Sequence, residues 1–168
     1  MPDANSVGEF KLNVVGVPEN GTIPEKFIFN DWGCTGENKS PGLEWEGAPE
    51  GTKSFALTMY DPAAPTGSGF WHWVVFNIPA SVNSIPEDVR SNGGVPVPAI
   101  EGRTDWGAPG YGGPVPPPGD KPHPYIFTVY ALGVEALPLD NQASAAMVGF
   151  MINQNKLASA SFTAHYGR

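Results

Sequence analysis

The sequence has a single cysteine, Cys34, which excludes an intramolecular disulfide and fits a reducing compartment. No stretch approaches the roughly 18 consecutive apolar residues that a membrane-spanning helix needs. The first residues have neither the basic region nor the apolar region of a secretory signal. From these absences we expect a cytoplasmic protein without a transmembrane segment.

Positive charge is also scarce. The chain has 9 Lys and Arg residues against 17 Asp and Glu residues, which gives a formal net charge of −8. Proteins that bind nucleic acids contact phosphates through clustered basic residues, so this composition argues against a nucleic-acid partner. Any anion that binds here must be held by local geometry, because the overall field of the protein repels it.

Several motifs of known chemistry are absent. The chain has no Gly-x-Ser-x-Gly, and residues 67–69 (Gly-Ser-Gly) lack the spacing of a serine nucleophile turn. The glycine-rich segment 107–113 is not followed by the Gly-Lys-Ser/Thr of a phosphate-binding loop. No closely spaced pair of histidines indicates a metal site. We therefore predict no cofactor and no bound metal.

The residues that are present indicate a mainly β fold. With 21 Gly and 19 Pro in 168 residues, the chain has the composition of a turn-rich protein, and its length fits a single domain, residues 1–168. Asp140 or Asn141 can cap one helix over residues 142–153, with Met147, Phe150 and Met151 on one face. Alternating or β-branched runs predict strands, which together favour a β-sandwich with long Pro/Gly-rich loops: 10–17, 27–29, 43–45, 53–60, 71–78, 125–132 and 157–166.

Three side chains at strand ends form the one cluster that suggests function. Asp61 ends the strand before a loop stiffened by Pro62 and Pro65, and His72 begins the next strand. His123 follows a second proline-rich loop, residues 113–124. Because Tyr125 lies two residues after His123, both point to one face if the chain is extended there. We predict that these side chains meet in one small polar pocket.

The chemistry of such a pocket is restricted. An imidazole can donate a hydrogen bond to an oxyanion, whereas a bare carboxylate beside the same anion would repel it. Asp61 is therefore better interpreted as orienting a histidine. Two alternatives stay open on residue types alone: a two-histidine, one-carboxylate metal site, and a purely structural role in which His72 is a core histidine and Asp61 closes a turn.

The motifs around these residues, in their order, resemble the phosphatidylethanolamine-binding protein family, also called Raf-kinase-inhibitor-like proteins, particularly its compact microbial branch. The similarity covers nearly the whole chain. It is carried by segments that include Asp61-Pro-Ala-Ala-Pro65, His72-Trp73, Arg103-Thr-Asp-Trp-Gly107 and residues 113–123 (Gly-Pro-Val-Pro-Pro-Pro-Gly-Asp-Lys-Pro-His).

The resemblance implies a β-sandwich-like fold with a pocket for phosphate-type head groups. It places Asp61, His72, His123 and Tyr125 among the pocket residues, with Gly113 supplying backbone and Trp73 a wall. It also implies a cis peptide bond at Ala64–Pro65. Three positions depart from the family pattern, where the family has a second acid, a cysteine and an arginine: Ala63, Val115 and Pro124.

Two functions follow from the resemblance, beside that of a pure interaction protein with a vestigial pocket. The first is a binding protein for a small anionic or phosphorylated ligand, which modulates a kinase or protease by surface contact. The second is an isomerase or cyclase that reuses the pocket for acid–base or pericyclic chemistry on a small organic substrate, with Asp61, His72, His123 and Tyr125 as catalytic residues. The sequence leaves the oligomeric state open, a homodimer included.

Overall fold

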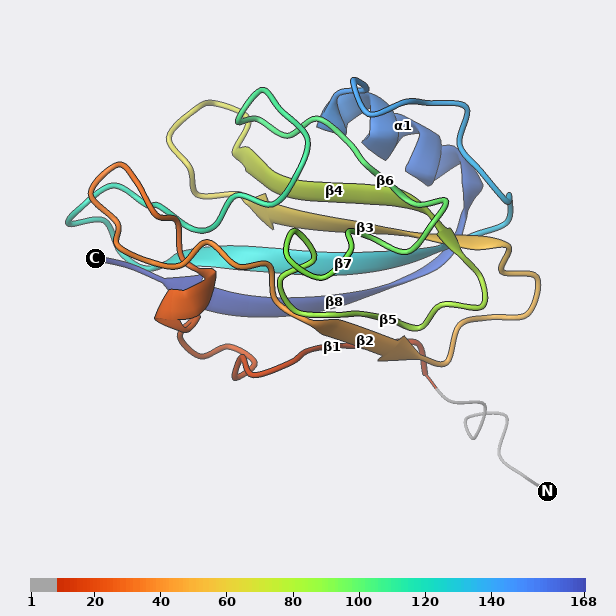
Figure 1. Cartoon of the computed structure of the whole chain (residues 1–168), viewed down its shortest axis with the longest axis horizontal. Coiled ribbons are helices and arrows are strands. Elements are labelled where there is room, and N and C mark those ends of the chain that lie inside the picture. The colour runs from red at the N-terminus through yellow and green to blue at the C-terminus, as the bar shows by residue number, and fades with distance from the viewer. Residues whose placement is uncertain (1–8) are drawn as a thin grey trace.

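The computed structural model describes residues 9–168, which form two antiparallel sheets and one α-helix (Figure 1). The smaller sheet has the strand order β1 (Lys11–Val14), β2 (Leu43–Glu46) and β5 (Ser84–Ile85). The larger sheet has the order β6 (Ile100–Glu101), β4 (Phe70–Pro79), β3 (Ser54–Asp61), β7 (His123–Leu132) and β8 (Lys156–Tyr166). The helix α1 spans Ala145–Asn155, between β7 and β8. The predicted mainly β fold, with two sheets and a helix in the C-terminal half, is confirmed.

The main core lies between the two sheets. In β2, Leu43 and Trp45 are buried while Glu44 and Glu46 are exposed, so this strand covers the core with one face. Across the interface the Trp45 ring meets Phe55 of β3 edge to face, at 5.4 Å between ring centroids. Strands β3 and β4 are buried on both faces, because α1 covers the outer face of the larger sheet (Figure 1).

The helix differs from its prediction in both start and orientation. Ser144 is the N-cap, and its side chain accepts a hydrogen bond from the Met147 backbone N–H at 3.2 Å. Ala145, Val148 and Ile152 are buried against the sheet, whereas Met147 and Phe150 are exposed. Both sets of residues have helical spacing, so periodicity alone could not decide which face packs against the sheet.

The N-cap gives a first testable prediction. Ser144→Ala is expected to lower the free energy of unfolding by about 1 kcal/mol, because it leaves a backbone N–H of the first helical turn without its acceptor. Asn141→Ala, at a predicted cap position that does not cap the helix, is the matched control. Urea unfolding of the two variants checks the assignment, and an equal loss in both would contradict it.

A second difference is in residues 27–29, which were predicted as a short strand. The chain instead forms the 3-10 helix η2 (Glu25–Phe27), in which the N–H groups of Phe27 and Ile28 donate to the carbonyls of Pro24 and Glu25.

No helix within residues 9–168 has the length and apolar character that a membrane crossing requires.

The antiparallel order of the larger sheet positions the candidate site. It brings the C-terminal ends of β3 and β8 and the N-terminal ends of β4 and β7 together at one end of the sheet, on the left of Figure 1. Strand β7 is extended from His123 onward, with His123 opposite Tyr166 of β8. This was the condition under which His123 and Tyr125 share one face.

Candidate functional site

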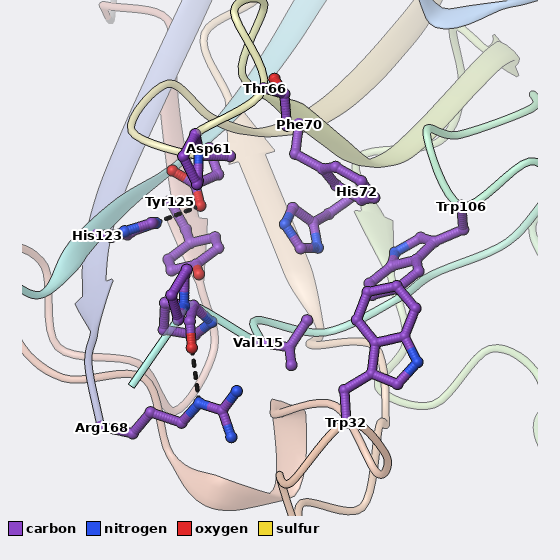
Figure 2. Close-up of a pocket in the computed structure, with 14 residues that line it drawn as sticks. Trp32, Asp61, Thr66, Phe70, His72, Trp106, Val115, His123, Tyr125 and Arg168 are labelled. Carbon is purple, nitrogen blue, oxygen red and sulfur yellow. Dashed lines mark hydrogen bonds and ion pairs between the residues drawn. The ribbon is translucent and has the colours of Figure 1, made fainter. Parts of the chain in front are cut away.

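A cavity of about 320 Å³ lies at this end of the larger sheet (Figure 2). Four of the predicted site residues line it together, namely Asp61 from β3, His72 from β4, and His123 and Tyr125 from β7. Phe70 at the start of β4 also lines it. Loops and the end of the chain supply the remaining lining residues: Trp32, Ala64, Pro65, Thr66, Trp106, Val115, Pro116, Pro117 and Arg168.

The other two predicted site residues lie outside the lining. Trp73 is fully buried in the core between the sheets, where its indole Nε1 donates to Glu101 Oε1 at 2.9 Å. The backbone N–H of Gly113 donates to Asn38 Oδ1 at 2.7 Å, so it is not available to a ligand. The wall that was expected from Trp73 is supplied by Trp32 and Trp106.

A β-bulge explains how His72 reaches the cavity. Met59 pairs with Trp73 and the next residue of β3, Tyr60, pairs with Trp71, so His72 is an extra residue in β4. In a regular strand His72 and Trp73 would point to opposite faces of the sheet. The bulge lets His72 turn into the cavity while Trp73 stays in the core, because a bulged residue is freed from the alternation.

His72 is a neutral hydrogen-bond partner at this site. Its Nδ1 lies 2.7 Å from the carbonyl oxygen of Gly112, and because a carbonyl can only accept, Nδ1 carries the proton. Burial lowers the pKa of His72 to about 4, although the carbonyl of Gly112 and the charge of Asp61 partly oppose this. Near pH 7 the ring is therefore neutral.

His123 lies between two carboxylates. Its Nδ1 is 2.7 Å from Asp61 Oδ2, and its Nε2 is 3.0 Å from Asp120 Oδ2. The other oxygen of Asp61 accepts a hydrogen bond from the backbone N–H of Ala63 at 2.9 Å. Burial alone would lower the pKa of His123, but the hydrogen bonds to Asp61 and Asp120 outweigh it and raise this pKa. Asp61 thus orients a histidine, and that histidine is favoured as a cation.

Tyr125 presents an unpaired hydroxyl to the site. Its Oη is buried and makes no hydrogen bond within the described part of the chain, residues 9–168. Burial, then the negative charge of Asp61 and the approach of the hydroxyl to that carboxylate, raise the pKa of Tyr125 well above its usual range. The group therefore stays protonated and can donate a hydrogen bond to a ligand.

One wall of the cavity is aromatic. Trp106 stacks on Phe29 at 4.4 Å between ring centroids and lies 4.8 Å from Trp32 and 4.9 Å from Phe70. Trp32 lies beside Trp106 in this wall (Figure 2) and is 63% exposed. This wall was not predicted from the sequence, although Trp106 lies in a segment that carries the family resemblance.

Arg168 adds a second positively charged side chain to the lining, besides His123. Its Nε donates to the carbonyl oxygen of Pro116 at 2.6 Å, which holds the guanidinium beside the cavity (Figure 2). Sequence reasoning did not identify Arg168, because only the pairing of β8 with β7 brings this end of the chain to the site.

The expectation of a cis bond at Ala64–Pro65 is wrong. Within residues 9–168 the cis X-Pro bond is Val97–Pro98, away from the cavity lining. The Ala64–Pro65 peptide is trans, in a tight turn closed by a hydrogen bond from the Thr66 N–H to the Ala64 carbonyl at 2.8 Å. Pro65 still lines the cavity.

The three departures from the family pattern lie in different environments. Val115 lines the cavity, so replacement of the family's cysteine changes the wall that a ligand meets. Ala63 contributes its backbone N–H to Asp61. Pro124 of β7 lies opposite His165 of β8 and does not line the cavity.

The metal alternative has no geometric support in the described residues. No group of three or more His, Cys, Asp or Glu side chains within residues 9–168 is placed to hold a metal ion. Both nitrogens of His123 already face carboxylate oxygens.

Comparison with known proteins agrees with this architecture. Residues 15–167 match the sequence model of the phosphatidylethanolamine-binding protein family. The chain is 54% identical over 141 residues to the UPF0098 protein YbcL of Escherichia coli strain K12, an alignment that covers 83% of this chain and 77% of YbcL. It is 50% identical over 146 residues to YbhB of the same strain, covering 86% of this chain and 91% of YbhB. The crystal structure of E. coli YbcL superposes with a TM-score of 0.92 at 48% identity, covering 96% of this chain and 99% of that one. The chain therefore belongs to the phosphatidylethanolamine-binding protein family.

Proposed function

We propose that this protein is a binding protein whose cavity holds a small ligand by a phosphate-type anionic group. The observation that carries the proposal is the unpaired hydroxyl of Tyr125. Buried polar groups in proteins nearly always have a hydrogen-bond partner, and those that lack one in a cavity mark a place for a ligand atom. A buried, protonated hydroxyl can donate a hydrogen bond to an anionic oxygen of a ligand.

The charges of the lining support an anion. Arg168 is positive at every relevant pH, and His123 is favoured as a cation by its two carboxylate partners. Asp61 supplies one negative charge, which its hydrogen bond with His123 offsets. With neutral His72, the lining residues carry a small positive charge in a chain of net charge −8. This suits a small anion or a zwitterion held by local geometry.

The aromatic wall supports a ligand with an organic part. Trp32, Trp106 and Phe70 offer apolar surface next to the polar end of the cavity. Aromatic faces also attract an ammonium group. A phosphorylated amine, the head group in the family's name, fits this combination of one polar end and one aromatic wall.

The geometry favours binding over acid–base catalysis. A histidine that exchanges a proton with a substrate needs one nitrogen free while another group orients the other nitrogen. His72, whose Nδ1 is held by the Gly112 carbonyl, is a weak base near pH 7 because burial lowers its pKa to about 4. In His123 the first nitrogen faces Asp61 and the second faces Asp120. The isomerase or cyclase alternative is for that reason the weaker of the two. The kinase or protease partner, the homodimer and the cytoplasmic location stay predictions.

Tyr125→Phe tests the proposal. The variant keeps the ring and removes the hydroxyl, so we expect about tenfold weaker binding of phosphoethanolamine and of inorganic phosphate, measured by calorimetry. Tyr111→Phe is the matched control, because the Tyr111 hydroxyl donates to the Phe27 carbonyl at 2.7 Å and lies outside the cavity lining. Absence of binding of both ligands to the wild type, or equal affinity in Tyr125→Phe, would refute the proposal.

A further inference from the structure

We infer that Asp120, which lies outside the cavity, is a positioning residue that keeps His123 oriented and positively charged, and so sets how well the cavity accepts an anion. The inference rests on the proposed function, because it concerns the affinity of the same cavity for the same class of ligand. Asp120 itself does not line the cavity, so it acts through His123.

Asp61, His123 and Asp120 form a chain from the cavity to the surface. The side chains of Asp61 and His123 are each 4% exposed, whereas that of Asp120 is 44% exposed. His123 directs Nδ1 toward Asp61 at the cavity (Figure 2), and its Nε2 faces Asp120 on the other side. The Asp120 loop is itself anchored, since the N–H of Gly119 donates to the carbonyl of Arg168 at 2.8 Å.

This arrangement requires a cationic ring. A neutral imidazole has one N–H donor and one lone pair, so it can donate to only one of the two carboxylates. The imidazolium donates to both. Without Asp120, Nε2 would have no carboxylate acceptor to stabilise a proton on it. A neutral ring with its proton on Nδ1 could then make the remaining hydrogen bond, to Asp61.

The charge of His123 matters to a ligand because Asp61 lines the cavity. When His123 is cationic, it offsets the Asp61 carboxylate at 2.7 Å. When His123 is neutral, that carboxylate faces a bound anion without compensation, in a site where solvent screens charges weakly.

Other ionisable groups lie around His123, on β8, at the end of the chain and in the cavity lining. Tyr166, opposite His123 on β8, has its pKa raised to about 12 by burial and by its hydrogen bond to Glu25. Arg168 stays cationic, and burial holds the pKa of His72 at about 4. Burial keeps Tyr125 protonated. His165, beside Pro124 in the ladder, must be followed by its own resonance in a titration.

The first arm of the test is a side-chain NMR titration without ligand. In Asp120→Asn the imidazole of His123 is expected to lose its proton at lower pH than in the wild type. The control is Asp140→Asn, which removes the same charge from an exposed position outside the cavity lining and should leave His123 unchanged. If His123 titrates alike in Asp120→Asn and in the wild type, the inference is overturned, whatever the protein binds.

The second arm measures inorganic phosphate binding by calorimetry across the same pH range. At pH values between the His123 midpoint of the variant and that of the wild type, Asp120→Asn is expected to bind about fivefold more weakly than the wild type. In this range the His123 ring is neutral in the variant and still cationic in the wild type. Below both midpoints it should bind at least as tightly, since one negative charge is gone. A uniform loss at every pH would indicate a structural role and overturn the inference. A shifted midpoint in a protein that binds no phosphate would instead overturn the proposed function.

Discussion

Replacing Asp61 with asparagine is expected to lower the free energy of unfolding by about 3 kcal/mol near neutral pH. Asp61 and His123 form a 2.7 Å pair in which both side chains are 4% exposed. Removal of Asp61 leaves the buried His123 with only the half-exposed Asp120 as its partner, which costs more than loss of a surface ion pair. Asparagine keeps the size and the oxygen that accepts from the Ala63 N–H, so the loss reports the charge rather than a void.

Urea unfolding followed by the fluorescence of the 5 tryptophans measures this effect. Asp105→Asn is the control, because Asp105 is an exposed loop carboxylate that also accepts a backbone N–H, from Trp71 at 2.8 Å. We expect it to cost about 1 kcal/mol or less. A loss in Asp61→Asn no larger than that of the control would contradict the buried pair.

The pH dependence of the same variant has a defined sign. The folded protein raises the pKa of His123 above its ordinary value of 6.5, so the stabilisation from its protonated form is fully present below that value. It is lost as the pH rises through the raised pKa. The stability difference between the wild type and Asp61→Asn should therefore be largest on the acid side of this range and smaller on the alkaline side. A pH-independent difference would contradict the cationic state of His123.

The fold could be predicted because its determinants are local or repetitive. The alternation in β2 and the double-sided apolar pattern of β3 and β4 required no knowledge of partners. The helix shows where this fails. Residues 147, 150 and 151 (i, i+3, i+4) and residues 145, 148 and 152 (i, i+3, i+7) both have helical spacing, and only the capping hydrogen bond of Ser144 and contact with the sheet select the buried face.

The candidate site was predictable where it depends on strand ends. Asp61, His72, His123 and Tyr125 were expected to meet because stiff loops hold the adjoining strand ends, and the structure brings them to one cavity. The bulge at His72 depends on its register with β3, so a pattern within one strand could not reveal it. Strict alternation placed His72 and Trp73 on opposite faces of the sheet.

The aromatic wall depends on contacts between distant loops. Trp32 and Trp106 lie 4.8 Å apart between ring centroids, yet they come from separate irregular segments without periodicity. Trp32 also has a positive φ of 53°, a left-handed backbone conformation that is uncommon for tryptophan and that no sequence pattern predicts here. Trp32 and Trp106 were therefore assigned no role, and Trp73, which the resemblance made a wall, lies in the core between the sheets.

Acid is expected to destabilise the protein through His72. In the folded state the pKa of His72 is lowered from 6.5 to about 4 by burial, so below pH 6.5 the unfolded chain binds a proton at this position that the folded protein does not. A folded-state pKa below the unfolded value means that stability falls with falling pH across this interval, by about 3 kcal/mol in total. His123 contributes no slope there, because its pKa is shifted upward and its stabilisation is already complete below 6.5.

His72→Gln isolates this contribution. A glutamine amide can still donate to the Gly112 carbonyl, but it does not titrate, so the variant should lose less stability between pH 6.5 and 4 than the wild type, whatever its stability at neutral pH. His165→Gln, in β8 outside the cavity lining, is the control and should retain the wild-type slope. Urea unfolding at intervals across this range gives the three slopes. Equal slopes in His72→Gln and the wild type would mean that the ring is hydrated enough to accept a proton in the folded state, and His72 would then present a cation rather than a neutral nitrogen to the ligand.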